Sequence, residues 1–145
     1  MQAWTPIVTI EKGGSKLPFF CFHSVGGYVY RYYELARALG PEQPFYGLQA
    51  VGTDGKSTPL TSIEAMTALY LEAIRTIQPQ GPYLLGGYSF GCGLALEMAR
   101  QLQVQGEDVG RLILIDGRAP KLADQAQRSI DFVDWLVDSL YADLE

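Results

Sequence analysis

Short apolar runs alternate along this chain with longer segments of helical period. The runs predict strands buried on both faces, because such strands are apolar throughout. The longer segments carry apolar residues at i, i+3, i+4 and i+7, as amphipathic helices do. We predict strands at 7–10, 17–22, 45–48, 83–85 and 109–115, and helices over 32–39, 63–77 and 90–103.

Strands that are separated by helical crossovers favour a mostly parallel sheet with helices on both faces, which is an α/β fold. Ligands bind such sheets beyond the carboxyl ends of the strands. Three notable segments follow predicted strands: residues 23–27 (His-Ser-Val-Gly-Gly), residues 87–91 (Gly-Tyr-Ser-Phe-Gly) and the pair 116–117 (Asp-Gly). The predicted fold therefore gathers all three segments on one rim of the sheet.

Composition narrows the class of protein without naming a reaction. The chain has 145 residues, 48% of them hydrophobic and 19% charged, as expected for one globular domain. The net charge of −5 argues against nucleic acid and anionic membranes as partners. Without a membrane-spanning apolar run or a signal peptide pattern, the sequence predicts a cytoplasmic protein.

Metal or cofactor chemistry is not expected from this sequence. The two cysteines, Cys21 and Cys92, lie among apolar residues without metal-ligand spacing, so we interpret them as buried free thiols. No metal cluster or phosphate-binding glycine loop is recognisable. We therefore predict that the chain itself holds no cofactor.

The most informative segment is Gly-Tyr-Ser-Phe-Gly, which centres on Ser89. It matches Gly-x-Ser-x-Gly, and it lies between a predicted strand and a predicted helix, as a nucleophile elbow requires. The glycines avoid collisions in a sharp turn, and the helix N-terminus favours developing negative charge. The alternative is a glycine-rich helix start in which Ser89 is only an N-cap.

A serine nucleophile needs a general base, an orienting acid and an oxyanion hole. Asp116 follows the next strand, which is where this chain order places the acid, although it is also a candidate cap of a turn with Gly117. The oxyanion hole needs two N–H groups, which we assign to Phe90 and Val25. The loop that contains Val25 is alternatively a plain tight turn.

These residues together resemble the thioesterase domains of nonribosomal peptide and polyketide synthases, over nearly all of residues 7–120. The most specific segments are 20–23 (Phe-Cys-Phe-His) with the glycine pair 26–27, and 81–91 (Gly-Pro-Tyr-Leu-Leu-Gly-Gly-Tyr-Ser-Phe-Gly). Segments 97–100 and 112–116 add to the resemblance. A carboxylesterase or lipase-like hydrolase shares the elbow but explains segment 81–91 less well.

The resemblance implies an α/β-hydrolase fold and an activity. Ser89 would attack the thioester of an acyl, peptidyl or polyketide chain carried on the phosphopantetheine of a carrier protein. The acyl-enzyme would then pass its chain to water, or to an amine or hydroxyl of the chain itself. The resemblance assigns Asp116 as the triad acid, and Val25 and Phe90 to the oxyanion hole. Cys92 stands where the family usually has glycine.

One element of the family pattern is missing from these residues. The family's triad histidine follows the acid, beyond a helical lid and further strands, whereas the chain's one histidine, His23, precedes the nucleophile. The family pattern gives His23 a structural role beside the oxyanion loop, although its place at a strand end on the same rim also makes it an alternative candidate for the base. We therefore expect residues 1–120 to form the hydrolase core without its C-terminal strands, and residues 121–145 to begin the lid.

Two further expectations follow from this missing histidine. Loss of one triad member leaves about 10³–10⁴-fold catalysis over water, so we expect the chain alone to be a poor thioesterase. The alternative function is a catalytically inactive module that binds a carrier or takes part in assembly. An exposed sheet edge also makes a homo-oligomer an expected partner arrangement.

Overall fold

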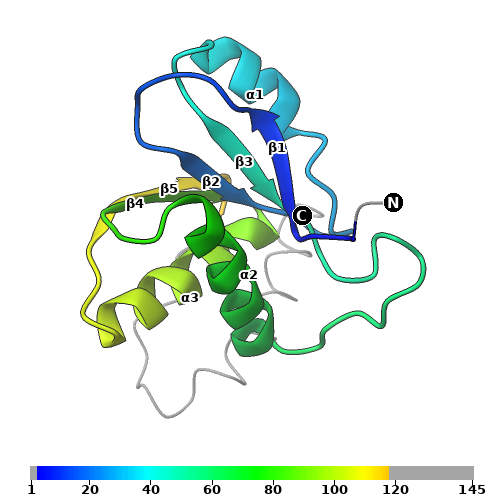
Figure 1. Cartoon of the computed structure of the whole chain (residues 1–145). Helices are drawn as coiled ribbons and strands as arrows, with labels where there is room; N and C mark the ends of the chain where they lie inside the picture. The colour runs from blue at the N-terminus through cyan, green and yellow to red at the C-terminus, as the bar shows by residue number, and fades with distance from the viewer. Residues whose placement is uncertain (1–2, 118–145) are drawn as a thin grey trace.

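A computed structural model describes residues 3–117, which form five strands and three helices (Figure 1). The strands are β1 (Ile7–Glu11), β2 (Phe19–Phe22), β3 (Phe45–Leu48), β4 (Tyr83–Tyr88) and β5 (Val109–Ile115). The helices are α1 (Tyr32–Leu39), α2 (Ile63–Ile77) and α3 (Phe90–Val104). Every predicted element in this range is present, and the region predicted as the start of a lid, 121–145, lies outside the described residues.

Three strand boundaries differ from the prediction, the first being the end of β1, which extends by one residue to Glu11. β2 starts at Phe19, because Leu17 is 47% exposed and precedes the buried part of the run. β4 continues through Gly86 and Gly87 to Tyr88, beyond its predicted end at Leu85. A Cβ at Gly86 would lie 2.7 Å from the Phe19 ring, so glycine permits close packing within the strand rather than ending it.

The five strands form one sheet in the order β1-β3-β2-β4-β5. β3, β2, β4 and β5 run parallel, and β1 joins the edge antiparallel to β3. The prediction of a mostly parallel α/β sheet is therefore confirmed. Among the described residues β5 forms the opposite edge, pairing only with β4, and its Ile113 is 38% exposed.

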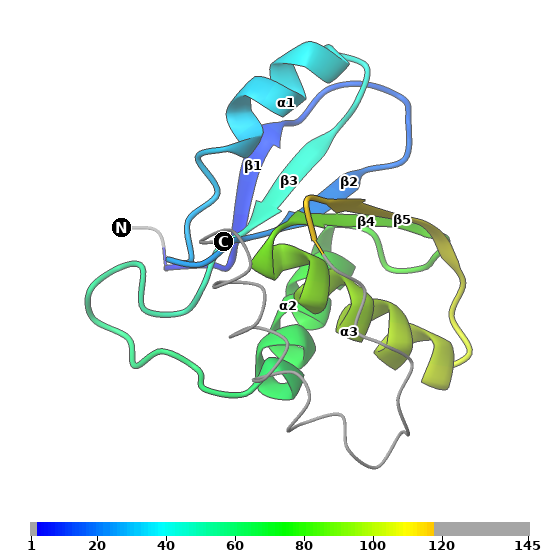
Figure 2. The same ribbon diagram turned by 180° about the vertical axis from the view of Figure 1, so that it is seen from behind.

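Helices cover both faces of the sheet (Figures 1 and 2). α1 covers one face through a cluster that includes Phe19, Tyr32 and Phe45. α2 and α3 cover the other face through a larger cluster that includes Leu85 and Met98. Ser62 caps α2, since its hydroxyl accepts the Ala65 N–H at 3.1 Å. None of the described helices is long and apolar enough to cross a membrane.

The chain leaves neighbouring strands toward opposite faces at one point of the sheet. After β2 it runs to α1, whereas after the adjacent strand β4 it runs into α3 on the other face. This divergence between β2 and β4 is a topological switch point, where open α/β sheets place their ligand sites. The segments that follow β2 and β4 are the ones singled out in the sequence.

Candidate active site

Ser89 occupies a strained turn between β4 and α3. Its φ of 55° and ψ of −115° are rarely adopted by residues other than glycine. The turn leaves no space beside it: a Cβ at Gly87 would lie 2.2 Å from the Gly91 carbonyl carbon, and one at Gly91 would lie 2.4 Å from the Phe22 oxygen. Both flanking glycines are thus needed for close backbone approach, and Ser89 has the geometry of a nucleophile elbow.

Asp116 lies beside this elbow at the end of β5. The Ser89 N–H donates to the Ile115 carbonyl at 3.0 Å, which joins the elbow to the residue before Asp116. Asp116 is exposed and has a φ of 51°. Its carboxylate accepts no hydrogen bond from the residues between 3 and 117. The structure therefore brings the predicted acid to the same rim as the predicted nucleophile.

The loop that follows β2 is fixed through the Ser24 carbonyl. This oxygen accepts the Gly27 N–H at 3.0 Å, and the His23 Nδ1 lies 3.0 Å from it. In a planar trans peptide the N–H points opposite to the C=O, so the Val25 N–H is directed away from these two donors. Within the described part of the chain this N–H makes no hydrogen bond. The loop thus leaves the Val25 N–H unpaired within the described residues, as is required of a donor that binds an oxyanion.

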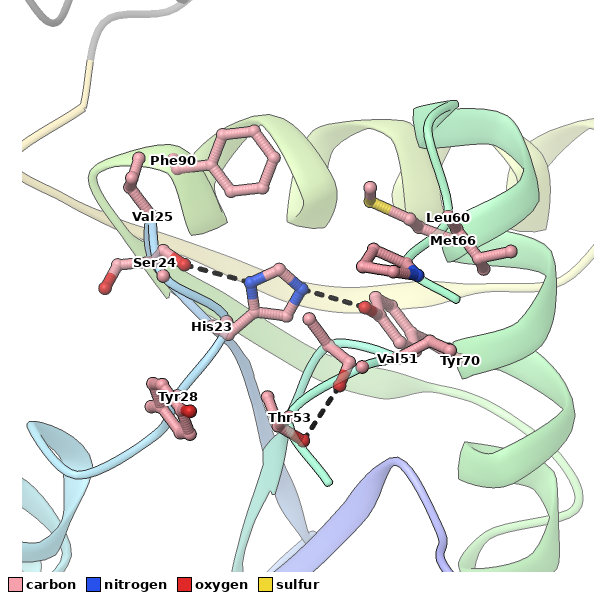
Figure 3. Close-up of a pocket in the computed structure, with 15 residues that line it drawn as sticks. His23, Ser24, Val25, Tyr28, Val51, Thr53, Leu60, Met66, Tyr70 and Phe90 are labelled. Carbon is pink, nitrogen blue, oxygen red and sulfur yellow. Dashed lines mark hydrogen bonds between the residues drawn. The ribbon is translucent and has the colours of Figure 1, made fainter. Parts of the chain in front are cut away.

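His23 has both ring nitrogens engaged. Its Nδ1 faces the Ser24 oxygen and its Nε2 lies 2.8 Å from the Tyr70 hydroxyl, which donates to it (Figure 3). The side chain is 3% exposed, and this burial lowers the pKa of the imidazole. The ring also stacks on Phe90 at a centroid distance of 5.8 Å. These contacts support the structural role for His23 and leave no nitrogen available to deprotonate Ser89.

Two tyrosines that the sequence presents only as apolar helix positions hold the site together. Tyr32 on α1 donates its hydroxyl proton to the Phe22 carbonyl and accepts the Tyr88 N–H at 3.0 Å. It therefore bridges β2 and β4 where they diverge and their ladder ends. Tyr70 on α2 orients His23. The only signal in the sequence is a tyrosine on a buried helical stripe, since a buried hydroxyl needs a partner.

Both cysteines are buried free thiols, as predicted. Burial raises the pKa of each thiol. The Cys92 sulfur lies 3.2 Å from the Gly87 carbonyl oxygen, below the elbow, and a Cβ at Gly117 would approach it to 2.3 Å. Cys92 therefore packs against the segment that carries Asp116. Within residues 3–117 no three His, Cys, Asp or Glu side chains are grouped as metal ligands.

A pocket of about 380 Å³ opens beside the loop that follows β2 (Figure 3). Val25 and Phe90 line one side of it, and Leu60 and Met66 line the other. His23 lies between these two sides. The pocket therefore adjoins the two residues that the sequence assigns to the oxyanion hole.

The fold and this elbow define the chain as an α/β protein of the hydrolase class. Comparison with known proteins narrows the class. Residues 17–140 match the profile of the Thioesterase domain family, so this chain belongs to that family.

Several relatives with curated descriptions are synthases or synthetases. The chain is 44% identical over 119 residues to indigoidine synthase of Dickeya dadantii (strain 3937), an alignment that covers 82% of this chain and 8% of that protein. It is 40% identical over 110 residues to a dimodular nonribosomal peptide synthase of Bacillus subtilis (strain 168), covering 76% and 5%. The chain thus spans only a small part of these large relatives.

Solved structures agree with this assignment. A holo four-domain nonribosomal peptide synthetase matches with a TM-score of 0.75 at 35% identity, covering 85% of this chain and 10% of the other. The NocB thioesterase domain, in covalent complex with a fluorophosphonate nocardicin G analogue, matches with a TM-score of 0.72 at 27% identity, covering 93% and 68%. The prediction of a thioesterase-type fold is therefore confirmed.

Proposed function

We propose that this chain is the nucleophile-bearing part of a thioesterase that releases acyl or peptidyl chains from the phosphopantetheine arm of a carrier protein. The observation that carries the proposal is the strained elbow at Ser89, with its φ of 55° at the start of α3. Such an elbow exposes a serine hydroxyl above the sheet, where a substrate reaches it. Relatives that are peptide and polyketide synthases support a carrier-bound thioester as the substrate.

In the proposed reaction, Ser89 Oγ attacks the thioester carbonyl carbon while a general base takes the hydroxyl proton. Negative charge develops on the carbonyl oxygen, where the N–H groups of Val25 and Phe90 stabilise it. The C–S bond then breaks, and the pantetheine thiolate takes the proton back from the base. Water, or an amine or hydroxyl of the chain, attacks the acyl ester and regenerates Ser89.

The general base is the part that these 145 residues do not supply. His23 is the one histidine of the sequence, and its nitrogens are engaged with Ser24 and Tyr70. We propose that a histidine outside this sequence, oriented by Asp116, acts as the base. The chain alone is then a weak thioesterase, because the elbow and the oxyanion hole act without proton transfer.

A fluorophosphonate probe tests this proposal, because it reacts with nucleophilic serines. We expect slow labelling of the chain, detected by intact-protein mass spectrometry and mapped to Ser89. Added imidazole, a diffusible base, is expected to accelerate the labelling. Ser89→Ala is expected to abolish it, whereas the control Ser15→Ala, on an exposed bend, keeps the full rate. No labelling of the folded chain even with imidazole would favour a catalytically inactive carrier-binding module instead.

A further inference from the structure

We propose that Tyr32 is a positioning residue, which sets the spacing between the two N–H groups of the oxyanion hole. The role of that hole rests on the proposed function, whereas the geometric link between its two sides does not require a reactive Ser89. Tyr32 belongs to α1, on the face of the sheet opposite to α3 (Figures 1 and 2). The register of the sheet, the place of the hydroxyl and the burial of the ring each support this role.

The register between β2 and β4 shows where a backbone hydrogen bond is expected. Phe22 pairs with Gly87 in parallel register, as the last pair of these two strands. The His23 N–H is directed to the other neighbour, β3, where it donates to the Leu48 carbonyl at 2.9 Å. Since successive residues of a strand direct their backbone groups to alternate sides, the Phe22 carbonyl is directed toward β4. A regular parallel ladder would join this carbonyl to the N–H of Tyr88, one residue beyond Gly87.

The Tyr32 hydroxyl links these two backbone groups. It accepts the Tyr88 N–H at 3.0 Å and donates its own proton to the Phe22 carbonyl. A side chain from α1 therefore takes part in the last hydrogen-bonded step between β2 and β4. The separation of the two strands at this step depends on where α1 holds the hydroxyl.

This step immediately precedes both sides of the oxyanion hole. Val25 follows Phe22 by three residues, and Phe90 follows Tyr88 by two. Beyond this step the chain leaves β2 and β4 toward opposite faces of the sheet. A shift of one strand against the other here would move the Val25 N–H relative to Ser89 and the Phe90 N–H. A displacement of about 1 Å at a reacting centre can cost about 100-fold in rate.

The hydroxyl is held firmly enough to act as such a support. The Tyr32 side chain is 3% exposed, and its ring packs against Phe45 at a centroid distance of 5.9 Å. Its backbone N–H donates to the Val29 carbonyl at 3.1 Å, at the start of α1. Burial raises the pKa of the phenol, so the hydroxyl keeps the proton that it donates to Phe22. A buried hydroxyl that both donates and accepts has a defined orientation.

Packing also joins the two sides of the site, from the face that α3 covers. A Cβ at Gly91 would lie 2.4 Å from the Phe22 oxygen, and the His23 ring stacks on Phe90 at a centroid distance of 5.8 Å. These contacts limit how closely α3 approaches the loop after β2, but they are not directional. The hydrogen bonds of Tyr32 are directional, so their loss should alter the geometry of the site without preventing folding.

Tyr32→Phe tests this role, because it removes the hydroxyl and keeps the ring. Fluorophosphonate labelling of Ser89 is resolved into the affinity for the probe and the maximal labelling rate. We expect the maximal rate to fall about tenfold or more, with and without imidazole, while the affinity changes by less than about twofold. The matched control is Tyr83→Phe, at a fully buried tyrosine whose hydroxyl donates to the Gln78 carbonyl at 3.2 Å, at the other end of β4. It also loses a buried hydrogen bond, but it should be labelled at the wild-type rate.

Amide NMR shifts supply a readout that does not depend on reactivity. Tyr32→Phe should move the Val25 and Phe90 amide resonances, whereas Tyr83→Phe should move neither. Equal labelling rates in the two variants, or unmoved Val25 and Phe90 amides in Tyr32→Phe, would overturn the proposal. If wild type is never labelled but these two amides still respond to Tyr32→Phe, the positioning role is supported and the proposed reaction is refuted.

Hydrogen exchange in the wild-type chain keeps the proposal falsifiable if Tyr32→Phe does not fold. The Tyr88 N–H donates to a buried hydroxyl, so it should exchange as slowly as the Leu85 N–H within the same strand. Fast exchange of the Tyr88 amide beside a protected Leu85 amide would show that Tyr32 does not hold this end of β4, and the proposal would be wrong.

Discussion

The loop after β2 and the end of β5 approach Ser89 from the two neighbours of β4, and they are held very differently. On the β2 side, residues 23–27 are fixed by backbone hydrogen bonds to β3 and its loop, and by the buried pair of His23 and Tyr70. On the β5 side, Asp116 is exposed, and within residues 3–117 the segment is joined to the elbow through the Ile115 carbonyl and through the packing of Cys92 against Gly117.

This difference indicates which half of the site is complete within the described residues. The groups that would stabilise an oxyanion are preorganised by packing, so they require no further partner to hold their geometry. The proposed acid has its place on the rim but accepts no hydrogen bond from residues 3–117. Its orientation depends on the proposed base that it would bind. Substitutions on the two sides should therefore affect different properties.

The largest effect is expected at the elbow that both sides share. Gly91→Ala would place a methyl group 2.4 Å from the Phe22 oxygen, a backbone atom that cannot move independently. We expect a loss of about 3 kcal/mol or more in unfolding free energy, with loss of Ser89 labelling. Urea unfolding measures the change. Gly13→Ala is the control, because its methyl group would meet only ordinary contacts at 3.4 Å and beyond. A Gly91→Ala protein as stable as this control would contradict the elbow geometry.

Much of this site was predictable from the sequence, because its determinants are local. Gly-x-Ser-x-Gly between a strand and a helix specifies an elbow, and strand order along the chain placed residues 23–27 and Asp116 on its rim. The short apolar runs likewise predicted every described strand, and the segments of helical period predicted every described helix. Local patterns suffice here because the burial of a strand and the period of a helix both appear in the order of consecutive residues.

The parts that escaped prediction depend on contacts between distant residues. Tyr70 meets His23 across 47 positions and Tyr32 meets Tyr88 across 56, and no periodicity marks either pair. The predicted strand stopped at Leu85, before the glycine pair 86–87, because the Phe19 ring whose close approach explains Gly86 lies on another strand. The antiparallel placement of β1 was also not specified, since a strand's direction in the sheet is a property of tertiary structure.

A smaller effect is expected on the β2 side. His23→Leu leaves the buried Tyr70 hydroxyl without its acceptor, which costs about 1–3 kcal/mol in unfolding free energy. His23→Asn keeps an N–H donor near the position of Nδ1, so it should retain the Ser24 contact and the Ser89 labelling rate better than leucine does. Urea unfolding and labelling rates measure both. If Ser89 is labelled equally fast in the His23→Leu and His23→Asn variants, the contact between His23 and the Ser24 oxygen does not position the Val25 peptide.

On the β5 side, Gly117→Ala tests the packing beneath Asp116. Its methyl group would lie 2.3 Å from the Cys92 sulfur and 2.7 Å from the Cys92 Cβ. We expect a loss of about 1–2 kcal/mol, because an exposed edge segment shifts more readily than the elbow does. Cys92→Gly removes both contacting atoms and should suppress this loss in the double variant. Additive losses, measured by urea unfolding, would show that the two positions do not contact each other.

The smallest effect is a pH dependence of the unfolding free energy that arises at His23, on the β2 side. Burial lowers the pKa of His23 below its ordinary value of 6.5. In acid, the imidazole is therefore protonated more readily in the unfolded chain than in the folded chain. The stability that this neutral imidazole contributes is fully present above pH 6.5 and is lost as the pH falls toward the lowered pKa. The difference in unfolding free energy between wild type and His23→Asn should therefore shrink below pH 6.5. Parallel curves of unfolding free energy against pH, down to pH 5, would mean that His23 is not buried as a neutral group.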